Sequence, residues 1–503
     1  MSSIRFTPIP KGLSGLRAPR TKRGRQIAPP SVSARLNGNV TLEARAGGKI
    51  VACFDGYSVS VGTFSAGAAA RAQELREGLP LASFASSRRD IDKEIDQLVR
   101  RLARHGLLEY HLRVSSMGAD QAVIEPQLAD YWPRTQQLGD ADVVVLSRFA
   151  YMRRRGNEMV LESPRAGALF RICDPKIATA LALLAAPQSL KKLRRQDGFP
   201  GVDLLALLVD CQILFKTAGD NGLRPNEGDD NLVLWDFHDL LFHTRSTQGR
   251  HANPLGGVYP YAGATSPLPA VRPRWPGKQI DLRKFSAAHP QAISPLTELL
   301  RDRHSTREFD DRRPITLAEL SRFLDATARV LSRSSGPVDL GDGSPVVEYA
   351  ARPYPSAGAE YELELYLAVN KCEGLDRGFY HYDAGRHALV PIGVGARELE
   401  ALSAAAELAM GAPAVPQILI TIAARFGRIS WKYTSLAYAL ILKDVGVLMQ
   451  TFYLMATEMR LGGCAIGITD IDLFAKLTGI EFHVEGPVGQ FAIGRGTKSG
   501  TPD

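Results

Sequence analysis

The sequence lacks the short motifs that mark several large classes of protein. None of its five cysteines belongs to a Cys-x-x-Cys pair, which argues against a structural zinc site and a thioredoxin-like site. It contains neither a Gly-x-Gly-x-x-Gly fingerprint nor a Walker A loop, so no motif supports dinucleotide or nucleoside triphosphate binding. Widely spaced cysteines are typical of a reducing compartment, and we expect a cytoplasmic location. The cysteines are Cys53, Cys173, Cys211, Cys372 and Cys464.

Long uninterrupted apolar runs are also missing. The most apolar segment, residues 434–463, is interrupted by charged residues. Because a bilayer needs about 20 consecutive apolar residues, we expect a buried helix here and no membrane contact. The interrupting residues are Lys443, Asp444, Glu458 and Arg460.

Acidic residues are absent from the first 30 positions, which supply +7 of the net charge of +8. The rest of the chain is therefore close to neutral, so the net charge does not favour nucleic-acid binding by the body of the protein. We predict that residues 1–30 form a basic, disordered tail, solvated or in contact with an acidic partner. With 503 residues and 45% hydrophobic composition, the chain allows two to four globular domains.

The first half of the sequence contains two similar units. In each, short strand-like runs precede helices, and a short strand follows the last helix, as at residues 89–110 and 201–215. A helix that ends in a short strand is the pattern of a winged helix. We therefore predict two winged-helix-like modules, residues 31–135 and 136–220. Such modules clamp peptides, bind DNA, or have only a structural role.

A polar linker at residues 217–231 leads into a third region, residues 232–503. It begins with a predicted helix at 232–242 and a Pro/Gly-dense connection at 251–295, and the clearest regular structure follows. We assign residues 232–503 to one α+β domain. His238 and His243 are five residues apart and do not share a helical face, so together with Trp235 we interpret them as packing or channel residues. We predict no metal site.

Four short segments of this domain carry residues suited to a flat phosphorylated ligand. Arg303 and Arg307 would share one face of a helix and could hold a phosphate, with Ser305 between them. Taken alone, this run is more often a solvated surface. Small residues at 357–359, after Pro355, and again at 462–467 permit close approach by a ring. Arg495 adds a cation after the last strand. Together the four segments predict a flavin mononucleotide (FMN) site.

Several segments of this domain resemble motifs of a known family. The run RHSTREFD at residues 303–310 resembles the opening of the FMN-dependent nitroreductase superfamily. The segments RPYPSAG (352–358), GFYHYD (378–383) and Lys432-Tyr433 resemble its azoline dehydrogenase branch, of the SagB and cyanobactin oxidase type. Those enzymes oxidise thiazoline and oxazoline rings on ribosomally made peptides. The resemblance covers residues 230–496 well and the N-terminal region in outline, and it implies a central antiparallel sheet flanked by helices in a homodimer.

The resemblance also assigns roles by position. It implies that FMN lies at the homodimer interface, and the apolar helix expected at residues 435–461 suits a dimer core. Arg495 fits more loosely, because a Lys-x-Arg pair common in nitroreductases is absent. The implied FMN-binding residues are Arg303, His304, Ser305, Arg307, Pro355, Ser356, Ala357, Gly358, Ala465, Ile466, Gly467 and Arg495.

Lys432 and Tyr433 are the predicted catalytic pair. Aromatising an azoline removes a hydride, which the flavin accepts, and a proton, which needs a base within hydrogen-bond reach. A lysine shielded from water beside the flavin can be that base, and a tyrosine can relay the proton. The alternative is an ordinary surface lysine.

The sequence therefore predicts an FMN-dependent azoline dehydrogenase that acts on a ribosomally made precursor peptide. Its expected partners are that peptide, a cyclodehydratase that makes the azolines, and a second copy of the chain. Two alternatives remain. An NAD(P)H-dependent nitro or quinone reductase would turn over without peptide. A non-enzymatic winged-helix scaffold would be colourless and would bind a peptide or DNA.

Overall fold

The computed structural model describes most of the chain. The predicted basic tail, residues 1–30, lies outside the described residues. Those residues are 32–54, 56–85, 87–113, 118–128, 131–217, 227–247, 259, 262–274, 276–288, 293–338 and 344–497.

The N-terminal half repeats one arrangement of strands and helices, as the sequence predicts. In each unit the first strand lies between the strand that follows the first helix and the strand that follows the last helix, giving the orders β5-β1-β6 and β12-β8-β13. The first unit consists of β1 (Val32–Leu36), α1 (Ala66–Ala72), β5 (Leu79–Pro80), α2 (Asp90–Arg104), β6 (Leu108–Arg113) and β7 (Asp120–Pro126). The second consists of β8 (Val143–Leu146), α3 (Pro175–Ala182), β12 (Gln188–Ser189), α4 (Leu190–Leu193), α5 (Val202–Asp210) and β13 (Leu214–Thr217). The winged-helix interpretation of these units stays a prediction.

Each unit has a three-stranded insertion after its first strand. The first insertion forms its own sheet, β2-β3-β4, whereas β11 of the second pairs with β7 of the first unit. A seven-stranded sheet, β5-β1-β6-β7-β11-β10-β9, therefore joins the two units. The inserted strands are β2 (Thr41–Arg45), β3 (Lys49–Phe54), β4 (Tyr57–Thr63), β9 (Tyr151–Arg155), β10 (Glu158–Glu162) and β11 (Ala168–Ile172).

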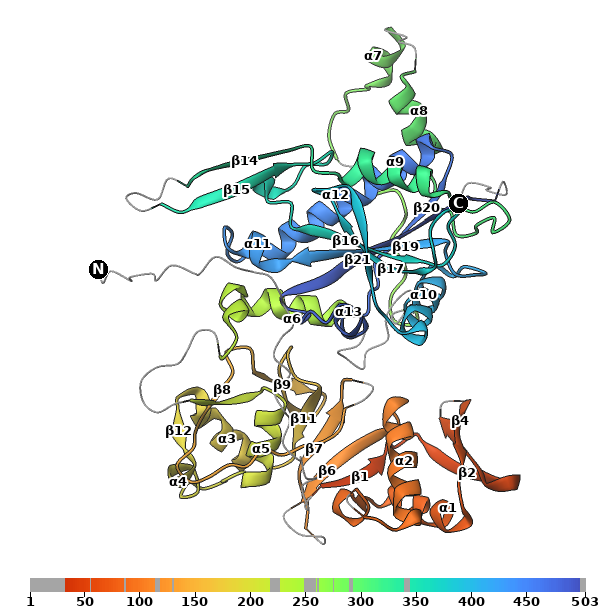
Figure 1. Ribbon diagram of the computed structural model, residues 1–503. Helices are drawn as coiled ribbons and strands as arrows, with labels where there is room; N and C mark the ends of the chain where they lie inside the picture. The colour runs from red at the N-terminus through yellow and green to blue at the C-terminus, as the bar shows by residue number, and fades with distance from the viewer. Residues whose placement is uncertain are drawn as a thin grey trace.

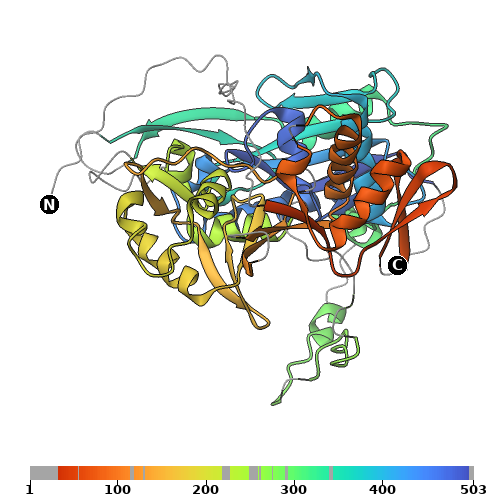
Figure 2. The same cartoon turned by 90° about the horizontal axis from the view of Figure 1, so that it is seen from below.

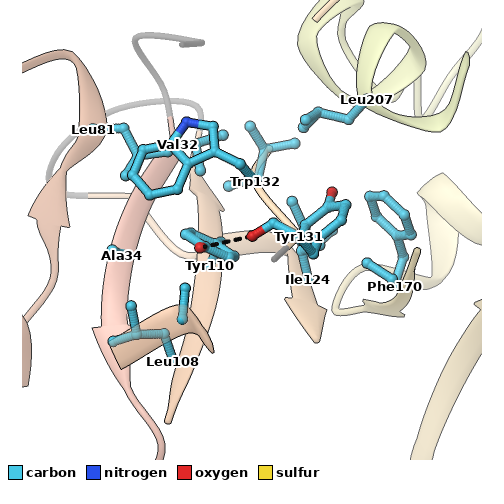
Figure 3. Packing of buried hydrophobic residues seen from close by; sticks show 14 of the residues in the cluster. Val32, Ala34, Leu81, Leu108, Tyr110, Ile124, Tyr131, Trp132, Phe170 and Leu207 are labelled. Carbon is cyan, nitrogen blue, oxygen red and sulfur yellow. Dashed lines mark hydrogen bonds between the residues drawn. The ribbon is translucent and has the colours of Figure 1, made fainter. Parts of the chain in front are cut away.

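One hydrophobic core runs through both units, from Val32 to Leu214. Tyr110 and Trp132 pack edge to face, and the Tyr110 hydroxyl donates a hydrogen bond to the Tyr131 carbonyl at 3.4 Å (Figure 3). The boundary predicted between residues 135 and 136 thus divides one continuous core rather than two independent ones.

The C-terminal half is a six-stranded antiparallel sheet with helices on both faces (Figure 1). Its order is β18-β17-β16-β19-β21-β20, and every residue of β19 from Ile418 to Ala424 is buried. One face packs against α9 (Leu317–Ala328) and α12 (Ala437–Glu458), and the other against α10 (Ala396–Met410) and α13 (Ile471–Thr478). This is the nitroreductase-like α+β fold that the sequence predicts. The strands are β16 (Leu363–Val369), β17 (Gly378–Asp383), β18 (Ala388–Ile392), β19 (Ile418–Arg425), β20 (Gly462–Ile466) and β21 (Glu485–Gly494).

Several elements extend from this sheet domain. The helix α7 (Arg283–Ala288) projects away from it in both views (Figures 1 and 2), whereas α8 (Pro295–Asp302) contacts α12. The hairpin β14 (Ser332–Pro337) and β15 (Val346–Ala351) forms a separate two-stranded sheet. The helix expected at 232–242 begins later, because Asp230–Leu234 is a 3₁₀ turn (η5) and α6 spans Phe237–Arg245. The remaining short elements are α11 (Phe426–Ser430), η1 (Ala46–Gly48), η2 (Gln73–Arg76), η3 (Leu81–Ser83), η4 (Leu183–Ala185) and η6 (Ala357–Ala359).

The helix α12 is only partly buried in the single chain. By length and composition it could cross a membrane, but it packs against β20, β21 and α9 of the sheet domain, and 33% of its most apolar window is buried. Leu436, just before its first turn, and Val447 are exposed to 46% and 37%. The inner side of α12 thus belongs to the core, and the outer side, which faces away from it, carries Val447 together with polar residues such as Lys443 and Gln450.

Candidate active site

The first predicted FMN segment is extended rather than helical. The helix α8 ends at Asp302, and Arg303 already has ψ of 122°. The following backbone lies beside the sheet: the Thr306 amide donates to the Gly463 carbonyl at 2.8 Å, and Phe309 forms an antiparallel bridge with Gly496. These bonds draw the backbone out of a helix, so the prediction that Arg303 and Arg307 share a helical face was wrong.

Tyr453 of α12 joins the first and third segments. Its hydroxyl lies 2.9 Å from the Ser305 hydroxyl and accepts a hydrogen bond from the Ala465 amide at 2.8 Å. The Arg303 guanidinium lies 5.0 Å from the centre of the Tyr453 ring. The half-buried side chain of Tyr453 therefore positions both segments. The sequence motifs did not predict this role.

The remaining residues of these segments line the same region. Burial raises the pKa of the Cys464 thiol and the charge of Arg307 opposes the rise, which places Arg307 near β20. His304 is exposed, and its Nδ1 lies 2.9 Å from the Asp302 carbonyl. Ile466 is buried, whereas Gly467 is exposed, and a Cβ built on it would meet no heavy atom of the described residues within 4 Å. The edge of the third segment is thus open to a ligand.

Arg495 has a different environment from the other predicted phosphate ligands. Its Nη2 lies 2.6 and 2.7 Å from the two carboxylate oxygens of Glu319. Glu319 in turn forms a capping box with Thr316 at the start of α9. The guanidinium of Arg495 is therefore engaged in an ion pair that ties the end of β21 to α9.

The second segment meets the predicted catalytic pair. The Lys432 ammonium donates to the Gly358 carbonyl at 3.0 Å. Gly358 has φ of +59°, and a Cβ at this position would collide with the Tyr433 hydroxyl and the Lys432 Nζ. Only glycine allows this approach. Pro355, at the start of the segment, is exposed.

Two buried carboxyl groups, those of Asp444 and Glu362, accept hydrogen bonds from the second segment. Asp444 of α12 accepts the Ala357 amide at 2.9 Å, and the Ser356 hydroxyl donates to Glu362 at 3.3 Å. Burial of Glu362, which is 0% exposed, and the nearby charge of Asp444 raise the pKa of Glu362 to about 7. A third acid, Glu360, is 3% exposed and lies 3.1 Å from the Lys432 ammonium. Glu360 and Glu362 stand just before the apolar strand β16, and this pattern was the signal in the sequence for these two buried carboxyl groups.

A cavity of about 580 Å³ opens beside Lys432. Glu360 and Arg428 belong to its wall, as does Tyr349, whose ring centre lies 5.9 Å from the Lys432 ammonium. The hairpin β14–β15 and the strand β17 supply much of the remaining lining. The Lys432 ammonium thus lies next to residues of the cavity wall, and its side chain is 34% exposed.

The predicted segments do not gather around one point within one chain. Segments one and three meet at Tyr453, and segment two meets Lys432, Tyr433 and Asp444, whereas Arg495 of segment four pairs with Glu319. Asp444 and Tyr453 are nine residues apart on α12, which corresponds to about 13.5 Å along the axis and to opposite sides of the helix. The expectation that all four segments surround one ligand is therefore not met within a single chain.

The candidate metal ligands have structural partners. Asp236, His238 and Asp239 have ligand atoms within 4.8 Å of one another. However, Asp236 accepts the Ser435 amide at 2.6 Å and Asp239 accepts the Tyr438 amide at 3.3 Å. These carboxylates therefore bind amides at the start of α12. Trp235 and His243 are buried with Phe426 and Tyr438 in an aromatic cluster, as the packing interpretation predicts.

Comparisons with known proteins match two separate parts of the chain. The family model described as nitroreductase matches residues 300–495, and the model described as cyanobactin oxidase ThcOx matches residues 144–252. A protein of Methanocaldococcus jannaschii described as a nitroreductase is 34% identical over 175 residues, which are 34% of this chain and 78% of the relative.

Solved structures resemble the chain at lower identity. A Ralstonia eutropha protein described as a nitroreductase is 24% identical and covers 42% of this chain and 88% of its own, with a TM-score of 0.31. A chain of the E. coli microcin synthetase McbBCD complex, solved with truncated pro-MccB17 bound, is 19% identical and covers 56% of this chain and 100% of its own, with a TM-score of 0.36.

The two family matches confirm the resemblance to the cyanobactin-oxidase-like branch that the sequence motifs indicate. The extent and identity of the archaeal match establish the wider assignment. The chain belongs to the nitroreductase family.

Proposed function

We propose that the protein is an FMN-dependent azoline dehydrogenase that oxidises thiazoline or oxazoline rings of a ribosomally made peptide to thiazole or oxazole. The observation that carries the proposal is the placement of Lys432. Its ammonium is fixed by the Gly358 carbonyl and by Glu360, beside Tyr433, and Glu360 belongs to the wall of a cavity. The match to the cyanobactin oxidase model supports the same reaction class.

The residues around Tyr453 fit the phosphate end of FMN. Two guanidinium groups, Arg303 and Arg307, and the Ser305 hydroxyl are suitable donors to a phosphate. Ala465 and Gly467 would border the ring, since Gly467 leaves open space beside the backbone. Arg495 does not fit this role, because its guanidinium is paired with Glu319. When bound, the flavin would accept the hydride that leaves the azoline ring.

A second copy of the chain would complete the site. Within one chain, the segment 355–358 and Lys432 lie on the opposite side of α12 from Ser305 and Ala465. A two-fold axis near α12 would place the Lys432 group of one protomer against the Arg303–Arg307 segment of the other. The exposed side of α12 would then be covered by the partner. A homodimer with two shared sites is therefore part of the proposal.

The protein's own part in the reaction is to orient the ring and remove a proton. Lys432 would take the proton from the ring carbon next to the one that loses the hydride, and Tyr433 would hydrogen-bond the ring or relay that proton. The ring loses one hydride and one proton from two neighbouring carbons, and the single bond between these carbons becomes the double bond that completes the aromatic ring. The cavity beside Lys432 offers room for the residues that flank the ring.

An NAD(P)H-dependent nitro or quinone reductase is the second candidate. The observation in its favour is the 34% identity to a protein described as a nitroreductase. Such an enzyme would oxidise NADPH in the presence of a nitroaromatic compound or quinone and without any peptide. The fixed Lys432 near the cavity has no part in that reaction.

The deciding experiment is mass spectrometry of an azoline-containing peptide after incubation with the FMN-loaded protein. We expect each ring to lose one dihydrogen. Lys432→Ala should keep the yellow colour and stop this loss, whereas Lys476→Ala, which changes a side chain of α13 that is 66% exposed, should not. Rapid NADPH oxidation without peptide, together with an unchanged peptide mass, would favour the reductase.

A further inference from the structure

The Lys432 ammonium is bound by two acceptors of different kinds. Its Nζ lies 3.0 Å from the Gly358 carbonyl and 3.1 Å from Oε1 of Glu360. An ammonium group has three donors, so one remains for a substrate. The Glu360 side chain is 3% exposed, whereas that of Lys432 is 34% exposed. The carboxylate is thus a buried anchor, and the more exposed lysine is held against it beside the cavity wall.

Arg428 binds the opposite oxygen of the same carboxylate. Its Nε lies 3.3 Å from Oε2 of Glu360 and donates to the Glu360 backbone carbonyl at 2.9 Å. A further Arg428 nitrogen donates to the Glu348 carbonyl of β15. Arg428 therefore has several fixed partners, and one buried carboxylate is shared between an arginine and a lysine.

This sharing has a consequence for proton transfer. An arginine stays charged at all ordinary pH values, so Glu360 keeps a cationic partner when Lys432 loses its proton. Without Arg428, deprotonation of Lys432 would leave a buried carboxylate unpaired, which is costly. Without Glu360, Lys432 and Arg428 would be neighbouring cations with no anion between them, and the neutral amine would be favoured.

We propose that Glu360 and Arg428 are a positioning pair that fixes Lys432 at the cavity and sets how readily its amine gives up and takes a proton. The catalytic meaning of this pair rests on the proposed function. The pair would allow Lys432 to alternate between ammonium and amine without leaving Glu360 unpaired.

Other ionisable groups contact the lysine, line the cavity or bind the Ser356 segment, and they have to be separated from this effect. They come from Lys432's own turn, from the hairpin β14–β15, from the strands β16, β17 and β19 and from the segments next to them. They are Tyr433, Arg333, Glu348, Tyr349, Arg352, Tyr361, Glu364, His381, Asp383, Arg425, Glu362 and Asp444. Glu364 is the best control, because it is a largely buried carboxylate of the same cavity that pairs with His381 at 3.3 Å and with Arg352 and Arg425 at 3.8 Å.

The test measures the amine of Lys432 directly. The full-length protein is labelled briefly with acetic anhydride over a range of pH, and tryptic peptides give the ratio of labelling at Lys432 to labelling at Lys476, whose side chain is 66% exposed. At pH 8 we expect Glu360→Gln to raise this ratio about tenfold and Arg428→Gln to lower it by a similar factor. Arg428→Lys, which keeps the charge, and Glu364→Gln should stay close to the wild type.

The opposite directions distinguish this role from a merely structural one. If both variants change the ratio in the same direction, or if neither changes it, the proposal is wrong. Because the labelling needs neither substrate nor flavin, it gives a result even if the protein oxidises no azoline. An inactive wild type with the expected labelling shifts would refute the proposed function and leave the positioning pair in place.

With an active enzyme, the pH dependence of the reaction rate provides a second test. The rate of azole formation should rise with pH along a limb that moves to lower pH in Glu360→Gln and to higher pH in Arg428→Gln. A fall in rate with no movement of this limb would contradict the proposal.

Discussion

The hydroxyl groups of Ser305 and Tyr453 lie 2.9 Å apart, although the two residues are 148 positions apart in the sequence. The same tyrosine hydroxyl accepts the Ala465 amide. One side chain of α12 thus fixes the positions of two segments that resemble FMN-binding motifs. The sequence gives no sign of this role, because a tyrosine in an apolar helix is equally suited to packing in the core. Tyr453 also packs edge to face against Phe491.

We predict that Tyr453→Phe weakens FMN binding while leaving the fold intact. The change removes two hydrogen bonds of about 1 kcal/mol each, so the dissociation constant of FMN should rise on the order of tenfold. Flavin fluorescence titration would measure it. Tyr438→Phe is the matched control on the same helix, because its hydroxyl contacts His243 in the aromatic cluster. Equal affinities for both variants would refute the role of Tyr453.

Arg307 and the nearby Arg312 provide a comparison between two cations, of which only Arg307 belongs to the first FMN segment. We predict that Arg307→Ala purifies with little or no FMN, because a phosphate would lose a charge-assisted partner. Arg312→Ala should keep normal occupancy, since the Arg312 side chain is 95% exposed and pairs only loosely with Asp310 at 3.6 Å. The ratio of absorbance near the flavin maximum to protein absorbance gives the answer. Normal occupancy in Arg307→Ala would remove it from the phosphate site.

Arg495→Ala should affect stability more than cofactor binding. The Arg495–Glu319 pair is about three-quarters buried and joins β21 to the capping box of α9, so we expect a loss of about 1–2 kcal/mol. Burial acts to raise the pKa of Glu319, but the hydrogen bonds from Arg495 and Thr316 together with the charge of Arg495 outweigh it, and the pKa is lowered. A lowered pKa means that this stabilisation is present at neutral pH and is lost as the pH falls through the folded-state value.

Thermal unfolding of Arg495→Ala and of Glu319→Gln, at neutral and acid pH, would measure this loss. Both variants should be destabilised at neutral pH, and the difference from the wild type should shrink in acid. A yellow protein with a lowered melting temperature is the expected result. Loss of FMN without loss of stability would restore Arg495 to the phosphate site.

The buried pair Glu362 and Asp444 should make stability depend on pH in the opposite sense. The pKa of Glu362 is raised from 4.5 to about 7 by burial and by Asp444. Between these values the folded protein holds a proton that the unfolded chain has released, so stability falls as the pH rises through this window and levels off above it. Glu362→Gln removes this effect. It should be more stable than the wild type at pH 8 by up to about 3 kcal/mol, and similar to it at pH 5.

Chemical denaturation of the wild type and of Glu362→Gln at pH 5 and pH 8 would test this. The control is Glu481→Gln, which removes a carboxylate from a residue outside this pair. If the stability difference between wild type and Glu362→Gln is the same at both pH values, Glu362 does not carry the proton.

The sequence predicted the fold more completely than the site. Periodicity and caps located α2, which begins with Asp90 and Asp92 and is followed by Gly106 with φ of +67°. Short motifs also located the segments around Ser305, Gly358 and Ala465. The conformation of residues 303–308 was missed, because it depends on backbone bonds to β20 and β21, which lie more than 150 residues further along the chain. The roles of Glu360, Arg428 and Tyr453 were missed for the same reason: each is defined by a long-range contact.

The separation of the two residue groups on α12 predicts that inactive variants complement each other. If Arg307 of one protomer and Lys432 of its partner serve the same flavin, a mixed dimer of Arg307→Ala and Lys432→Ala contains one intact site and one site that carries both changes. Random assembly makes half of the dimers mixed, so the mixture should recover about a quarter of the wild-type azoline oxidation. Each variant alone should be inactive, and so should a mixture of Arg307→Ala with the double variant Arg307→Ala/Lys432→Ala. Co-refolding or co-expression with two affinity tags would isolate the mixed dimer. Recovery in the first mixture and none in the second would show a shared site, whereas no recovery in either would require both residues to act within one chain.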